Sequence, residues 1–129
     1  MKFGMRKELA MGFDDALARV PEALKTEGFG ILTEIDVQDT LRKKLGIEFR
    51  RYRILGACNP PLAHRALSTE LEIGLMLPCN LIVYEQPGGG SVVAAIDPLA
   101  TIAATGSDDL REVAAAVHAK LERVLAQIG

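Results

Sequence analysis

Hydrophobic residues recur with two different periods in the first quarter of the chain. Between Phe3 and Leu9 the apolar residues fall at odd positions, the period of a short strand, which we expect at the edge of a sheet. From Phe13 onward the spacing changes to four, three and four residues, which predicts an amphipathic helix that ends near Gly28. Pro21 lies inside this helical pattern, and we expect it to kink or split the helix.

Alternation returns in the next stretch of the chain. The run from Gly30 to Val37 predicts a strand with one buried face. A short helix is then expected from Asp39 or Thr40 through Leu45, where Gly46 closes it.

The run from Phe49 to Ala57 predicts the next strand. Its period of two separates Tyr52, Ile54, Gly56 and Cys58 on one face from Arg51, Arg53 and Leu55 on the other. The first set is the better core face, because the second carries two arginines. Cys58 should therefore end the strand facing inward or into a cleft.

The second half of the chain begins with a capped helix and ends with a long one. Asn59 is a good N-cap and Pro60 a good first helical residue, so we expect a helix to about Ser68. Residues 79–85 and 91–97 predict two strands that pair as a hairpin across a glycine-rich turn. Asp97 then caps a short helix, and an apolar stripe marks the final one: Leu110, Val113, Val117, Leu121, Val124 and Ile128.

Strands and helices mix without strict alternation, and the late strands form a hairpin. We therefore expect an α+β fold in which a mostly antiparallel or mixed sheet packs with helices in two layers and a long helix ends the chain. A doubly wound parallel fold is the alternative. The 129 residues are expected to form a single domain, 1–129.

Composition narrows the classes of partner. Aromatic residues are 5% of the chain and tryptophan is absent, so the core must be aliphatic. The formal net charge of −2 gives no global field for nucleic acid. Six of the 15 basic residues lie between Arg42 and Arg53, a patch that could bind phosphate, but no RNA-binding motif accompanies it. We expect neither nucleic acid nor membrane as a partner.

Localisation follows from the start of the chain and from its cysteines. The first residues are charged and contain no apolar signal core, and no apolar run reaches the length that spans a bilayer. We expect a cytoplasmic protein in which Cys58 and Cys79 are thiols.

Cys58 is the sharpest candidate for chemistry. It comes directly before a predicted helix N-terminus, where unpaired N–H groups and the helix dipole would lower the pKa of a thiol. His64 would lie in the second turn of that helix, about 7 Å along its axis from the cap, and its side chain would point back toward the thiol. A Cys58–His64 pair would allow nucleophilic or general-base catalysis. The alternative is a buried, inert Cys58 and a surface His64.

A second candidate set surrounds Cys79. Two thiols on neighbouring strands could form a redox-sensitive disulfide, or bind a soft metal together with His64. The spacing typical of zinc sites is absent, so we assign no metal. Asn59 and Asn80 each follow a cysteine and complete a candidate ligand-binding set, although both suit ordinary capping and turn roles.

Three stretches together resemble one protein family. They are residues 28–36, residues 52–60 and the sequence Leu77-Pro78-Cys79-Asn80, in the same order and spread over nearly the whole chain. The chain resembles the bacterial and archaeal domain-of-unknown-function family 302. The resemblance implies a small α+β fold that is commonly homodimeric, with no settled activity. The cofactor, if any, is unknown from the sequence.

Three functions follow from these patterns. The first is a module that binds a small molecule or soft metal at the helix start after Cys58. The second is a thiol-dependent enzyme or redox protein with Cys58 as nucleophile and Cys79 as its resolving partner. The third is a structural or interaction homodimer without catalytic activity.

Overall fold

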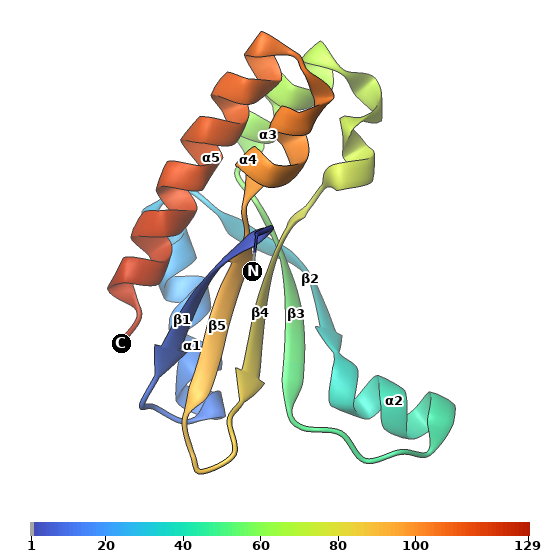
Figure 1. Ribbon diagram of the computed structural model, residues 1–129, viewed down its shortest axis with the longest axis vertical. Helices are drawn as coiled ribbons and strands as arrows, with labels where there is room; N and C mark the ends of the chain where they lie inside the picture. Colours follow the sequence, from blue (N-terminus) through green and yellow to red (C-terminus); the bar gives the residue numbers. More distant parts are fainter. Residues whose placement is uncertain (1) are drawn as a thin grey trace.

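Five strands pair into one sheet in the computed structural model, which describes residues 2–129 (Figure 1). Across the sheet the order is β1 (Gly4–Leu9), β5 (Ser91–Ile96), β4 (Cys79–Glu85), β3 (Tyr52–Cys58) and β2 (Gly30–Asp36). Every neighbouring pair is antiparallel. The predicted α+β class is therefore confirmed, the doubly wound alternative is excluded, and β1 lies at an edge as expected.

The chain contains five α-helices in all within residues 2–129. They are α1 (Phe13–Thr26), α2 (Val37–Leu45), α3 (Pro60–Thr69), α4 (Pro98–Thr101) and the long C-terminal α5 (Asp108–Gln127), with 3₁₀ segments η1 (Leu71–Met76) and η2 (Ile102–Thr105). Helices α1 and α5 cover one face of the sheet. α1 runs through Pro21 without interruption, so the expected split does not occur. Within residues 2–129, no helix is both long and apolar enough to cross a bilayer.

The core lies between the covered sheet face and the helices α1 and α5. Cross-strand register places Leu55 of β3 beside Leu81 of β4, which in turn lies beside Ala95 of β5, and all three are buried. The apolar stripe of α5, from Leu110 to Ile128, packs against this layer. The core is therefore mainly aliphatic, as the composition predicts.

The predicted core face of β3 is wrong. Leu55 and Ala57 belong to the core, whereas Tyr52 stacks on Tyr84 with ring centroids 5.5 Å apart on the opposite face. The prediction assigned the face with arginines to solvent. An arginine can nevertheless lie on the face that the helices cover, at the end of the strand where the layer of helices stops. Arg51 is such a case: its guanidinium pairs with an aspartate of α1 and lies over the Phe13 ring, 4.4 Å from its centroid.

Local capping was predicted more accurately than strand faces. The Asn59 Oδ1 accepts a hydrogen bond from the backbone N–H of Leu62, 3.3 Å away, and so begins α3. Asp97 caps α4 in the same way through the N–H of Leu99. These caps fix where β3 ends and α3 begins, which is the point around which the candidate site is built.

α2 differs from the other long helices. It begins at Val37 rather than at Asp39 or Thr40, because Asp36 supplies the cap. None of its residues is buried, and Figure 1 shows it projecting from the edge of the sheet next to β2.

Candidate functional site

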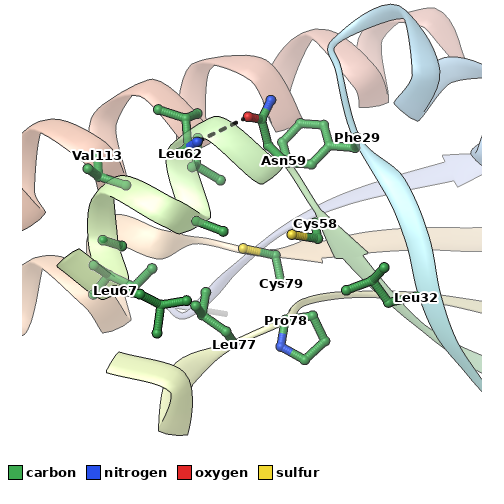
Figure 2. A pocket seen from close by; sticks show the side chains of 14 residues that line it. Phe29, Leu32, Cys58, Asn59, Leu62, Leu67, Leu77, Pro78, Cys79 and Val113 are labelled. Carbon is green, nitrogen blue, oxygen red and sulfur yellow. Dashed lines mark hydrogen bonds between the residues drawn. The ribbon is translucent and has the colours of Figure 1, made fainter. Parts of the chain in front are cut away.

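A cavity of about 300 Å³ lies where β3 and β4 meet the helices α3 and α5 (Figure 2). Its walls are largely aliphatic side chains from five parts of the chain: Leu32, Leu62, Ala63, Ala66, Leu67, Leu77, Pro78, Ile102, Val113 and Val117. Phe29 adds an aromatic ring, and Cys58, Asn59 and Cys79 complete the lining. No side chain that carries a formal charge at neutral pH is part of it.

Asn59 is the main polar residue of the lining, and its amide is tied to the scaffold. Its Oδ1 caps α3 and its Nδ2 donates to the backbone carbonyl of Glu27, 3.2 Å away. An amide has one further N–H and one further lone pair to offer. Asn59 can therefore hold two segments together and still present a polar group to a ligand.

The two cysteines occupy adjacent strands of the cavity floor. Ala57 of β3 lies opposite Cys79 of β4, so Cys58 is one residue away from direct pairing with Cys79. Both are free thiols, and Figure 2 shows both sulfurs among the cavity-lining side chains. Cys58 is half-buried, whereas Cys79 is only 6% exposed.

Burial changes the chemistry of Cys79. Loss of solvent, followed by the proximity of Cys58, raises the pKa of Cys79 from 9.0 to about 11. The dry surroundings disfavour the thiolate. Cys79 is therefore a neutral thiol at physiological pH and a poor nucleophile there.

A bulge in β2 shapes the mouth of the cavity. Ile31 pairs with Ala57 and Thr33 pairs with Gly56, so Leu32 is an extra residue that has no partner on β3. Bulges redirect a side chain, and Leu32 lines the cavity while remaining 67% exposed. The cavity thus opens to solvent beside Leu32.

The other two predicted site residues lie elsewhere. His64 is exposed on α3 and is not part of the cavity lining, and no hydrogen bond within residues 2–129 joins it to Cys58. Asn80 is also exposed and lines a different hollow, together with Phe3 and Ile82 on the opposite face of the sheet. The structure thus brings together Cys58, Asn59 and Cys79 of the five predicted residues.

Three of the six basic residues between Arg42 and Arg53 are paired with carboxylates. Lys43 pairs with Asp39, Arg51 with Asp14, and Arg53 with Glu34 and Asp36. In the described part of the chain, no group of three or more His, Cys, Asp or Glu side chains could hold a metal ion.

Sequence reasoning missed the apolar walls, which are most of the site. Leu32 gave no signal because a bulge depends on pairing between strands rather than on local sequence. Val113 and Val117 belong to the predicted stripe of the last helix, but the stripe alone does not separate residues that fill a core from residues that line a cavity.

Comparisons with known proteins agree with the sequence resemblance. The model of the family described as domain of unknown function DUF302 matches residues 5–128. A crystal structure of an uncharacterized conserved DUF302 protein from Bacillus stearothermophilus superposes with a TM-score of 0.90, at 32% sequence identity and with 100% of both chains covered. Among curated proteins, none matches significantly. The similarity therefore extends over the whole fold and brings no activity with it.

Proposed function

Because this chain belongs to the DUF302 family, whose function is unknown, its own cavity must indicate an activity, and we propose that the protein binds a small apolar molecule there. The observation that carries the proposal is the volume of about 300 Å³ combined with a lining that is almost wholly apolar. Protein ligand sites begin at about this size and are lined mainly by hydrophobic side chains.

The energetics favour an apolar occupant. The cavity opens to solvent beside Leu32, so water can enter it, but its aliphatic walls offer a water molecule few hydrogen-bond partners. An apolar ligand that covered these walls would gain about 25 cal/mol for each Å² of apolar surface removed from water.

The volume also limits the size of the ligand. An apolar cavity of about 150 Å³ accommodates benzene, so twice that volume suits a ligand of about ten to twelve carbon atoms. Asn59 is the one amide side chain of the lining, and a ligand group that reached it would gain a hydrogen bond there, which favours a single polar group such as a hydroxyl or carbonyl. The proposed ligand is therefore a medium-length aliphatic molecule with one uncharged polar end.

Thiol catalysis is less well supported than binding. A nucleophilic cysteine normally has an adjacent base that is itself held by a third group. The cavity lining contains no histidine and no carboxylate, and Cys79 remains protonated. The free state of both thiols fits the reducing interior of a cell, and we place the protein in the cytoplasm on that basis.

Methyl NMR with 1-decanol tests the proposed binding. Leu62, Leu67 and Val117 report on the cavity, whereas Val92 is buried elsewhere and Leu71 is exposed on η1. We expect saturable shifts in the cavity methyl groups with Val92 unchanged. Shifts confined to exposed leucines such as Leu71, or no shift up to the solubility limit, would contradict the proposal.

A second proposal concerns assembly: we propose that the chain forms a homodimer through α2. A helix with apolar residues normally buries them, yet no residue of α2 is buried and Leu45 is 65% exposed. Ile47 and Phe49, in the segment that follows α2, are exposed as well.

A further inference from the structure

The face of the sheet opposite the core carries an apolar row. Cross-strand register aligns Ala94, Ile82, Ile54 and Ile35 across β5, β4, β3 and β2. None of the four belongs to the core, which forms on the other face together with α1 and α5. Ile35 is 48% exposed, and Ile54 and Ile82 are only half-buried. We call the side of the sheet that carries this row the open face.

Aromatic side chains form a second row on the open face. Tyr52 and Tyr84 are cross-strand partners, and their rings stack with centroids 5.5 Å apart. Phe49 lies next to Tyr52, with ring centroids 6.3 Å apart, and is 42% exposed. It belongs to the segment that joins α2 to β3 (Figure 1). Exposed apolar surface therefore continues from α2 through Phe49 onto the open face.

We propose that the open face packs against the open face of a second copy of this chain. The inference rests on the proposed homodimer and deepens it, because it assigns most of the interface to the sheet and places α2 at its margin.

The distribution of charge suits contact with an identical face. Strand register places Arg6 and Glu8 of β1 on the open face at the outer edge of the sheet, where the two side chains pair at 2.9 Å. The residues that β3, β4 and β5 contribute to this face between Tyr52 and Ala94 are uncharged. A twofold interface brings the same patch of both chains together, so the patch must be compatible with itself. Two open faces meet this condition, since no like charges are opposed at their centre.

The open face is large enough for a stable dimer. Five strands about 4.8 Å apart, with six or seven residues each at about 3.3 Å per residue, form a face of about 24 Å by 20 Å. Two such faces would bury about 1,000 Å² even if they were flat, which is where specific interfaces begin. The face also has relief: Phe3 and Ile82 border a hollow of about 200 Å³, which would receive side chains of the second copy.

Tyrosine fluorescence tests the assignment without any substitution. The chain has no tryptophan and two tyrosines, Tyr52 and Tyr84, so its intrinsic fluorescence arises from the open face. We expect quenching by acrylamide to weaken as the protein concentration rises, in parallel with the dimer fraction measured by light scattering. A dimer whose tyrosines are quenched as strongly as those of the monomer would overturn the inference.

Substitutions on the open face provide a second test. Ile82→Glu and Ile35→Glu should each raise the dissociation constant of the dimer by roughly 100-fold or more, because each would bury an unpaired carboxylate in the interface. Leu75→Glu is the matched control, since Leu75 is an 88% exposed leucine on η1 and the variant should dimerise like the wild type. Circular dichroism and 1-decanol binding check that each variant is folded.

The outcomes separate this inference from the proposed homodimer. If Leu45→Glu is monomeric while folded Ile82→Glu and Ile35→Glu remain dimeric with wild-type affinity, the dimer forms through α2 and the inference fails alone. If the wild type is monomeric at every concentration, both fail. Monomeric Ile82→Glu and Ile35→Glu, together with concentration-dependent protection of the tyrosines in the wild type, are the expected result.

Discussion

Cys79 lies one residue out of register with Cys58 across β3 and β4, and the two thiols line one cavity from different depths. Cys58 is half-buried beside the start of α3, whereas Cys79 is almost fully buried. The same cavity therefore contains one thiol that reagents can reach and one that remains protonated.

Cys79 should make the protein less stable in alkali. Its pKa rises from 9.0 in the unfolded chain to about 11 in the folded protein, so only the unfolded chain gains by losing the proton between those values. Below pH 9 the ionisation of Cys79 does not affect the free energy of unfolding. Above pH 9 the free energy of unfolding falls by about 1.4 kcal/mol per pH unit, and the total loss is nearly 3 kcal/mol by pH 11.

Urea unfolding of the wild type and Cys79→Ala between pH 8 and pH 11 measures this effect. Other groups titrate in the same range, so the relevant quantity is the difference between the two proteins. We expect the free energy of unfolding of the wild type to fall more steeply than that of the variant. Parallel curves would show that Cys79 is not desolvated in solution.

Filling part of the cavity should stabilise the protein and weaken the binding of decanol. Ala63 lines the cavity and is half-buried, so Ala63→Leu would place three additional carbon atoms in the open volume. Cavity-filling substitutions commonly raise the free energy of unfolding by about 1 kcal/mol. Ser68→Leu, on the exposed side of the same helix, is the matched control. If Ala63→Leu bound decanol as well as the wild type, the ligand would be elsewhere.

Gly56 should not tolerate a side chain. A Cβ at this position would lie 2.1 Å from the Thr33 Oγ1 and 2.6 Å from the Pro78 Cγ. Gly56→Ala is therefore expected to cost about 1–3 kcal/mol through overpacking. Gly30, on the neighbouring strand, has nothing within 4 Å of such a Cβ, so Gly30→Ala should be neutral or slightly stabilising. Equal midpoints for the two variants in urea unfolding would refute the clash.

The proposed dimer should depend on α2. Light scattering at micromolar concentration is expected to give twice the chain mass of 13.9 kDa for the wild type. Leu45→Glu should give the mass of one chain, because it would bury an unpaired carboxylate in the interface. Leu71→Glu changes a leucine on η1 that is 81% exposed and should remain dimeric. A monomeric wild type would remove the proposal.

Local chemistry made much of the fold predictable. The caps at Asn59 and Asp97, the β4–β5 hairpin and the stripe of α5 each depend on residues close together in sequence, and each appears in the structure. The faces of β3 were assigned the wrong way round, because the sequence does not show how far the helical layer extends along a strand. Arg51 lies on the covered side and is paired with Asp14 in the first turn of α1.

Only the part of the candidate site at the junction of β3 and α3 could be predicted from the sequence. Cys58 and Asn59 carry a local signal, since they lie at the junction of a strand and a capped helix. Leu32, Pro78 and Val117 carry none, because the first depends on a bulge and the other two meet the cavity through tertiary packing. Sequence therefore indicated where chemistry might occur, whereas the size and apolar character of the site required the structure.

The most direct test of ligand binding is calorimetric titration with straight-chain 1-alkanols of increasing length. Each methylene buried in an apolar cavity contributes about 0.8 kcal/mol, so the dissociation constant should fall about fourfold per carbon. For a cavity of about 300 Å³ we expect this gain to stop near ten to twelve carbons, where the volume is filled. Affinity that continues to rise with chain length would indicate surface adsorption, and absence of binding at every length would contradict the proposed function.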